Sequence, residues 1–331
     1  MANVVRQSPG RRPRRRVGLS DILLTAAVNA ANATPSPFFY GGQAVIEGVL
    51  MRGRDHYAVA ARRPDGEITV IRQPLNSKLY RGNVWSMPFL RGVVGLWEML
   101  NLGMRALAWS ANVQLGDDAE ISPRALRGSM VFSALFGLFL ALGLPYLIGR
   151  LIHSGPHSVR QVLLEGVLRA LILLAYLALV GQVRPVARVF AYHGAEHKAI
   201  NNLELGNPGD VEHVRSASRL HPRCGTGFIV VVALVSAIVF APLGVLPDLL
   251  RHLLQLLLIP VVAGISYEAI RALAKVRYTT FGRVALIPVL GAQRLTTREP
   301  DDAQIEVSIA ALHAARGGEG TVSESHDALV P

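Results

Sequence analysis

The residues best suited to chemistry form a short pattern, His-x-x-Glu-His, at positions 193–197. Residues 185–205 are predicted to form a helix, because Pro185 suits a first helical turn and Gly206 suits a helix end. On that helix His193 and His197 face the same way, about 6 Å apart, so both imidazoles can bind one divalent ion. Glu196 lies one position off this face. In the inverted zinc-peptidase pattern a carboxylate at this place activates water.

A catalytic zinc site takes three protein ligands, so a third has to come from another segment. Glu204 is a poor candidate because it lies seven residues beyond His197, about 10.5 Å along the helix. His221 and Cys224 are better placed, since they directly precede an apolar segment and a His-x-x-Cys turn can present both side chains. We therefore predict metal ligands at His193, His197, His221 and Cys224, with Glu196 as the general base. Mixed nitrogen and sulfur ligands favour zinc among the divalent transition metals, with iron as an alternative.

Three other interpretations of this cluster stay open. The histidines can simply form hydrogen bonds at a membrane surface. Three histidines and one cysteine can form a closed structural site that leaves no coordination position for water. Cys224 can act as a nucleophile with His221 or His197 as base, although the sequence contains no accompanying acyl-transfer motif.

The composition indicates a membrane protein. Of the 331 residues, 51% are hydrophobic and 17% are charged, and the mean hydropathy is +0.34. Residues 128–149 and 224–247 contain no charged side chain and exceed the roughly 20 residues that a transmembrane helix needs. The shorter windows 170–183 and 252–267 become spans if the second helix is extended back through 161–168 and the fourth covers 249–270. Extension of the second helix requires that Glu165 pairs with Arg169 at the membrane interface. Extension of the fourth helix requires that the side chain of Arg251 reaches to the interface.

The basic residues predict the orientation. Of the 34 Lys and Arg residues, 30 lie in residues 1–127, 184–223 and from 271 onward, so the positive-inside rule puts both termini in the cytoplasm of a bacterial inner membrane. The net charge of +11 then mainly reflects topology, and with 6% aromatic residues we expect no nucleic-acid partner. The expected partner is the lipid bilayer, and a protein partner stays an open alternative. The single cysteine excludes an internal disulfide.

The segment before the first span predicts a small β module. Apolar runs at 44–51, 57–61 and 67–72 are separated by turn residues, and the sequence Pro64-Asp65-Gly66 predicts a hairpin. The leading pair Gly41-Gly42 permits backbone conformations closed to other residues. Glu47 lies inside the first apolar run and needs a partner, for which Arg52 or Arg54 is favoured over a metal.

We expect five parts along the chain. Residues 1–37 form a basic flexible leader, and residues 38–127 form the cytoplasmic β-hairpin module followed by an amphipathic helix at 88–113. Residues 128–270 form a four-helix membrane region with a cytoplasmic metal-site segment at 184–225. Residues 271–313 form a cytoplasmic C-terminal segment with a short helix at 305–313, and residues 314–331 are disordered. The expected fold is a mainly α membrane protein of about four transmembrane helices.

Four separate motifs carry a family resemblance. Residues 39–49 with Met51-Arg52-Gly53, residues 192–198, residues 221–226 and residues 293–300 together resemble the YqhQ-like family of bacterial polytopic membrane proteins. The resemblance covers most of residues 38–313. It implies a domain of unknown function that is described as a predicted metal-dependent enzyme, with no substrate. It also implies His193, Glu196, His197, His221 and Cys224 as site residues and adds Glu47 without a role.

These observations favour a metal-dependent, hydrolase-like enzyme whose site lies at the cytoplasmic membrane surface. The alternative is a membrane scaffold or assembly factor in which the His/Cys cluster is a structural metal clip. A transporter has little support, because the predicted spans contain few charged residues apart from Glu165, Arg169 and Glu268.

Overall fold

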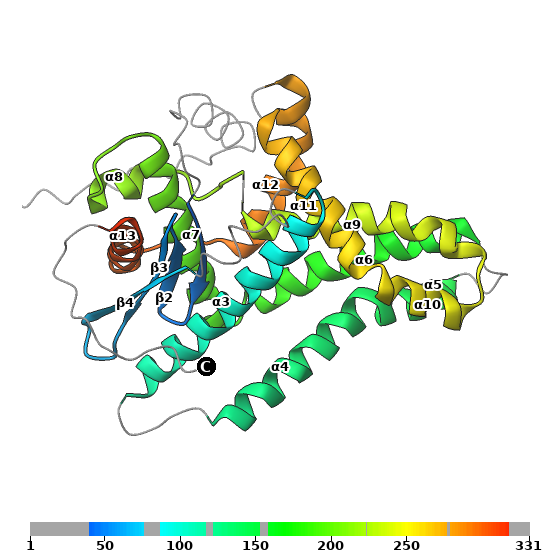
Figure 1. The fold of residues 1–331 in the computed structure, drawn as a ribbon, viewed down its shortest axis with the longest axis horizontal. Coiled ribbons are helices and arrows are strands. Elements are labelled where there is room, and N and C mark those ends of the chain that lie inside the picture. The colour runs from blue at the N-terminus through cyan, green and yellow to red at the C-terminus, as the bar shows by residue number, and fades with distance from the viewer. Residues whose placement is uncertain are drawn as a thin grey trace, which may run out of the picture.

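The computed structural model describes residues 40–75, 87–116, 122–152, 158–222, 224–276 and 279–317. Over these residues the protein is mainly helical with one β-sheet, as predicted, and it has two parts (Figure 1). The first is a sheet lobe, made of β1–β4 with α3, α7, α8 and α13. The second is a helical bundle, made of α4, α5, α6 and α9–α12. The predicted leader and residues 318–331 of the predicted disordered tail lie outside the described residues.

The sheet is an antiparallel meander in the order β1-β2-β3-β4. Its strands are β1 (Gly41–Val45), β2 (Gly48–Arg52), β3 (His56–Arg62) and β4 (Ile68–Pro74), and the predicted β3–β4 hairpin is confirmed. The single strand expected over 44–51 is wrong. Val45 pairs with Gly48, so Ile46 and Glu47 form a two-residue turn in which Glu47 has a positive φ of 50° and Ile46 does not.

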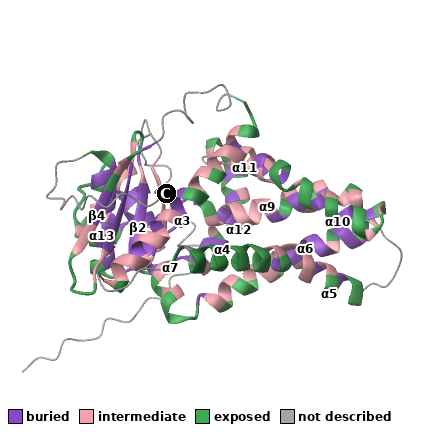
Figure 2. Cartoon of the chain, turned by 60° about the horizontal axis from the view of Figure 1, so that its bottom comes forward, coloured by how far each residue is buried: buried purple, intermediate pink, exposed green. Residues whose placement is uncertain are grey.

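Helices cover both faces of the sheet. Helix α7 (Arg184–Glu204) and the C-terminal helix α13 (Asp302–Arg316) pack on one face, and α3 (Leu90–Leu115) packs on the other. Alternate strand residues supply the two cores: Met51 and Ala58 face α7 and α13, whereas Leu50 and Val59 face α3. Short helix α8 (Val211–Ser216) lies beside α7 and α13. Figure 2 shows the buried residues concentrated in this lobe.

Three helical segments of the bundle are long and apolar enough to cross a membrane. The first covers residues 127–152 and contains α4 (Pro123–Leu138) from residue 127 onward, a π-helical turn (Phe139–Gly143) and α5 (Leu144–Ile152). The second is α6 (Val159–Val180), and the third joins α9 (Gly225–Phe240) to a 3₁₀ turn (Ala241–Val245). All three match predicted spans. Most of the side chains of α4 are exposed (Figure 2), as expected for a helix that faces lipid.

The fourth predicted span is not one straight helix. It consists of α10 (Asp248–Leu257) and α11 (Ile259–Lys275), which meet at an angle of 50°. The bend falls where Pro260 begins α11, because proline has no N–H to continue the hydrogen-bond ladder. The structure therefore has three candidate spans among the described residues, or four if the bent pair crosses as one.

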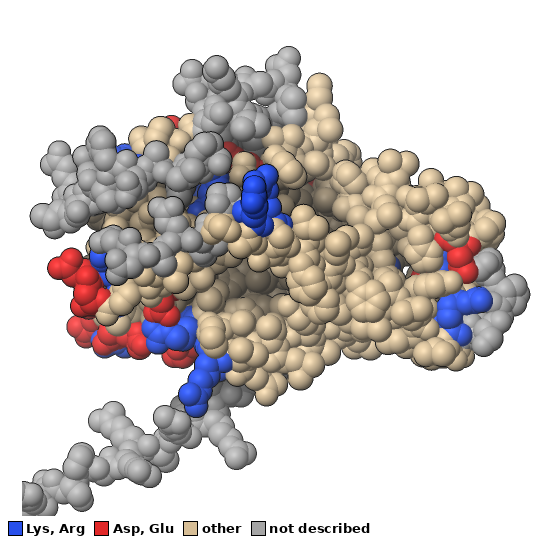
Figure 3. All heavy atoms as spheres, turned by 90° about the horizontal axis from the view of Figure 1, so that it is seen from below, with Lys and Arg blue, Asp and Glu red and all other residues tan. Residues whose placement is uncertain are grey.

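Charged residues gather on the sheet lobe and at the opposite tip of the bundle, with an uncharged band between them (Figure 3). Near that tip the predicted roles of three residues are wrong. Arg251 does not extend to an interface but is fully buried, and its Nη2 lies 3.3 Å from Glu165 Oε1. Glu165 thus pairs with Arg251 instead of Arg169, which donates to Ser236 Oγ at 2.7 Å. The partners come from other helices, which i,i+4 spacing within one helix does not reveal.

Helix α12 (Thr280–Thr296) was not predicted. Thr279 caps it, since its Oγ1 accepts a hydrogen bond from the Gly282 N–H at 3.0 Å. Its second half packs against the start of α9, where Val289 and Gln293 lie against Gly227. The end of α12 therefore reaches the junction between the bundle and the sheet lobe.

Candidate metal centre

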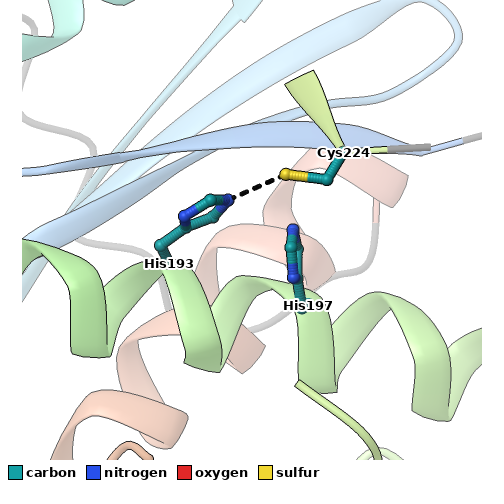
Figure 4. A group of neighbouring side chains, drawn as sticks. All are labelled: His193, His197 and Cys224. Carbon is teal, nitrogen blue, oxygen red and sulfur yellow. Dashed lines mark hydrogen bonds between the residues drawn. The ribbon is translucent and has the colours of Figure 1, made fainter. Parts of the chain in front are cut away.

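Three predicted site residues meet at this junction. His193 and His197 lie one turn apart on α7, with ring centroids 4.4 Å apart, and Cys224 approaches from the residue before α9. Their ligand atoms all lie within 4.8 Å of one another, and His193 Nε2 is 3.2 Å from Cys224 Sγ (Figure 4). His197 is 1% exposed and Cys224 is 7% exposed, whereas His193 is only partly buried.

Backbone carbonyls fix the orientation of both imidazoles. His193 Nδ1 lies 2.8 Å from the carbonyl oxygen of Thr296, and His197 Nδ1 lies 2.6 Å from that of Arg219. A carbonyl only accepts hydrogen bonds, so each Nδ1 carries the proton and donates it. Each Nε2 is then left to face the cluster, as in metal-binding histidines whose other ring nitrogen donates to a backbone carbonyl.

Cys224 occupies a position that stabilises a thiolate. It is the N-cap of α9, and its Sγ accepts a hydrogen bond from the Thr226 N–H at 3.4 Å and lies 3.1 Å from Thr226 Oγ1. Positive partial charge at a helix N-terminus favours an anion. The thiol thus has the environment of a metal ligand or a nucleophile.

The charges of the three residues depend on one another. Burial alone raises the pKa of Cys224, but the positive charges of His197 and His193 outweigh it and hold the pKa of the thiol well below its ordinary value. Burial likewise lowers the pKa of His193, but the charge and hydrogen bond of Cys224 raise it to about 9. Without a metal ion, these shifts favour a thiolate–imidazolium pair of Cys224 and His193. A divalent cation would take up the thiolate and displace a proton.

Glu196 lies beside the cluster but is not one of the three converging residues. Its side chain is directed at β1, where Gly42 donates a backbone hydrogen bond to the carboxylate. Burial raises the pKa of Glu196, and the charges of His193 and His197 act in the opposite direction. Its second oxygen, Oε2, is buried and has no hydrogen-bond partner among the described residues. A buried carboxylate oxygen of this kind needs a ligand, a water molecule or a proton.

His221 and Glu204 form an outer layer of the site. The His221 ring lies 5.7 Å from the His197 ring, centroid to centroid, and its Nε2 lies 3.6 Å from Glu204 Oε1. Gln293 Oε1 accepts from the His221 N–H at 3.0 Å. The structure thus brings His193, His197 and Cys224 together, and it places His221 next to them in contact with Glu204.

Sequence reasoning missed the contacts that join α7 to the β1–β2 turn of the sheet. The partner of Glu47 is neither Arg52 nor Arg54 but Arg188 of α7, whose Nε donates to Glu47 Oε1 at 2.5 Å and whose Nη2 contacts Oε2. Tyr192, the residue before His193, donates its hydroxyl to Glu47 Oε2 at 3.2 Å. Arg188 and Tyr192 lie four residues apart and therefore on the same face of α7, which is the signal that the sequence offered for a shared partner.

Gly42 is also required for a different reason than expected. Its φ is not positive, so no special backbone conformation is involved. A Cβ at this position would instead lie 2.4 Å from the Leu50 carbonyl oxygen and 3.0 Å from Glu196 Cδ. The glycine provides the space in which β1 approaches the Glu196 carboxylate.

The donor set fits a soft or borderline divalent metal. Two imidazole nitrogens and one thiolate suit zinc or another transition metal better than magnesium or calcium. Three protein ligands with an adjacent carboxylate match catalytic zinc sites, which keep one position for water or substrate. Addition of His221 as a fourth ligand would instead match a structural site.

Comparisons with known proteins agree with one another. Residues 87–317 match the family described as "Protein of unknown function (DUF1385)". The uncharacterized protein YqhQ of Bacillus subtilis is 35% identical over 288 residues, which cover 82% of this chain and 91% of that protein. The chain matches no solved structure.

Proposed function

The chain belongs to the YqhQ-like DUF1385 family, and we propose that it is a metal-dependent, hydrolase-like enzyme of the bacterial inner membrane with its site on the cytoplasmic side. His193, His197 and Cys224 would hold the ion, with zinc favoured, and His221 would support His197. The observation that carries the proposal is the convergence of these three ligand atoms within 4.8 Å, beside a buried carboxylate oxygen that has no hydrogen-bond partner among the described residues. Both termini and the sheet lobe would lie in the cytoplasm.

Glu196 would act as the general base. Burial raises the pKa of this carboxylate, so it binds a proton more readily than an exposed glutamate does. When bound, the ion would supply Lewis acidity to polarise a substrate carbonyl or phosphoryl oxygen. Glu196 Oε2 would take a proton from the attacking water, and the Gly42 N–H would hold the other oxygen in place.

One observation favours the second candidate, a scaffold whose cluster is a structural clip. The His221 ring lies close enough to His197 that a modest shift would bring a fourth ligand to the ion. Such a closed site would join α7, the 217–222 segment and α9, which belong to different parts of the fold.

Metal content tests the site itself. We expect about one tightly bound transition-metal ion per chain in the detergent-purified protein, measured by inductively coupled plasma mass spectrometry. The ion should be lost in His193→Ala/His197→Ala and kept in the matched control His213→Ala/His313→Ala, whose histidines are exposed. If the folded wild-type protein binds no ion even after zinc or iron supplementation, both metal proposals fail. The Cys224–His193 thiolate–imidazolium pair would then remain as the chemistry of the site.

Ligand counting separates the enzyme from the clip. In the enzyme, X-ray absorption of the zinc-loaded protein should show one sulfur, two imidazoles and one further light atom, and His221→Ala should leave the imidazole count unchanged. In the clip, His221→Ala should remove one imidazole. Glu196→Gln should keep the ion in both cases, and loss of the ion in this variant would contradict the role of Glu196 as a base that does not bind the metal.

A further inference from the structure

The end of α11 and the beginning of α12 form a helical hairpin that leaves the bundle. We name residues 271–287 the α11–α12 hairpin; residues 277 and 278 within it lie outside the described ones. Figure 1 shows it in orange, rising across the direction in which α6 and α9 run. Further along α12, Val289 lies against Gly227 at the start of α9. The hairpin therefore departs sideways at the level where the third candidate span begins.

The hairpin exposes large apolar side chains. Phe281 is 74% exposed, Val284 is 60% exposed and Ile287 is 41% exposed. Gly282, Leu286 and Val289 are buried, so the exposed residues form the outward face of α12. An apolar helix face of this kind needs a covering surface.

The same hairpin is strongly basic. Residues 271–287 contain four Lys and Arg residues and no Asp or Glu. Arg271, Lys275 and Arg283 are all exposed. Arg271 lies close enough to Glu268, one turn earlier on α11, to interact with its charge. Exposed apolar side chains next to basic ones are typical of helices that lie in the headgroup region of an anionic membrane. A protein that covered this apolar face would need a negatively charged surface around its apolar contact.

We propose that the α11–α12 hairpin binds the anionic lipid headgroups of the cytoplasmic leaflet. Phe281, Val284 and Ile287 enter the boundary between headgroups and acyl chains, and Arg271, Lys275 and Arg283 contact lipid phosphates. The inference rests on the membrane placement of the proposed function but is independent of the metal. It has a consequence for the site, because the carbonyl of Thr296 at the other end of α12 holds His193.

Hydrogen–deuterium exchange of the full-length protein in nanodiscs tests this proposal. The reporter is a peptide covering residues 276–287, since the first N–H groups of α12 have no partner within the helix. Exchange should be at least about fivefold slower in discs with phosphatidylglycerol than in pure phosphatidylcholine, because about 1 kcal/mol for one basic residue near the surface corresponds to this factor. High salt should reduce the difference.

Charge variants provide the control. Arg271→Gln/Lys275→Gln/Arg283→Gln should remove the difference between the two disc types, and Arg271→Lys/Arg283→Lys should keep it. Equal exchange in both discs, or a difference that survives in the Gln variant, would overturn the proposal. Protection that depends on protein concentration and not on lipid charge would instead indicate a second copy of the chain as the cover. Slow hydrogen–deuterium exchange of residues 127–152 and 225–245 in neutral discs would show that these helices lie in the membrane, even if the hairpin does not bind anionic lipid.

Discussion

Gly42 of β1 and Glu196 of α7 are in direct contact inside the sheet lobe, next to its junction with the helical bundle. A side-chain carbon on Gly42 would lie 3.0 Å from both Cδ and Oε1 of Glu196. The Gly42 N–H donates a hydrogen bond to the same carboxylate. The β module thus supplies part of the proposed site, although 154 residues separate the two positions. The contact gives the N-terminal sheet a function beyond packing.

Gly42→Ala should lower the free energy of unfolding by about 1–3 kcal/mol. The new methyl group meets the Leu50 carbonyl oxygen at 2.4 Å, and backbone atoms cannot move aside easily. The matched control is Gly41→Ala, where a Cβ meets nothing within 4 Å, and its effect should stay within about 0.5 kcal/mol. Denaturant unfolding in one detergent compares the two variants. Equal stability of both would show that β1 does not approach Glu196 this closely.

The pair of Glu47 and Arg188 predicts a pH dependence of stability. The hydrogen bond from Arg188 holds the pKa of Glu47 below its ordinary value of 4.5. The pair therefore stabilises the fold fully above about pH 4.5, and this contribution disappears as the pH falls through the lowered pKa. Because Arg188 is 55% exposed, the contribution is only about 1 kcal/mol.

Glu47→Gln measures that contribution. Its melting temperature should be lower than that of the wild-type protein at pH 7, and the difference should shrink on acidification to about pH 3. Arg63 and Asp65 form an exposed pair in the β3–β4 turn, so Asp65→Asn serves as the control with a smaller effect at pH 7. A difference for Glu47→Gln that grows on acidification would contradict the assigned pairing.

Local patterns in the sequence predicted local structure well. The i,i+4 spacing of His193 and His197 required only the α7 helix, and charge-free windows identified two spans directly and a third after extension past Glu165 and Arg169. The same spacing rule failed for Glu165 and Arg169. Their spacing allows them to pair, but Glu165 pairs with Arg251 of α10 and Arg169 donates to Ser236 of α9. Spacing along one helix gives candidate pairs, and the packing of the other helices decides which pairs form.

Long-range contacts account for what was missed. The residues that orient the site use backbone atoms, namely the carbonyls of Thr296 and Arg219 and the N–H of Gly42. A backbone group is present at every position, so residue types do not reveal these contacts. The bend before α11, in contrast, could have been predicted, because Pro260 marks it in the sequence. The fourth span was nevertheless expected to be one continuous helix.

The buried contact of Arg251 with Glu165 should contribute strongly to the stability of the bundle. Arg251 is fully buried and also lies 3.0 Å from Asp248, and its guanidinium stacks 5.4 Å from the centre of the Tyr146 ring. Arg251→Met leaves Glu165 buried without its cation, which should cost about 3–5 kcal/mol. Arg160→Gln, at the exposed start of α6, should cost less than about 0.5 kcal/mol.

A double-mutant cycle shows whether the loss comes from the pair. Glu165→Leu/Arg251→Met removes both charges, so it should be more stable than Arg251→Met alone. Thermal unfolding of the four proteins in one detergent gives the coupling energy. Additive effects of the two substitutions would mean that Glu165 and Arg251 do not interact.

The proposed orientation in the membrane can be tested with single cysteines. Arg160 and Glu212 are both exposed, at the start of α6 and on α8, and the positive-inside rule puts them on opposite sides of the membrane. In intact cells a maleimide that cannot cross the membrane should label Arg160→Cys and spare Glu212→Cys, and lysis should expose both. The native Cys224 is buried, so it should react slowly in either sample. Labelling of Glu212→Cys in intact cells would invert the topology and move the sheet lobe with its His/Cys cluster outside the cytoplasm, where the reduced thiolate of the proposed site would no longer be protected from oxidation.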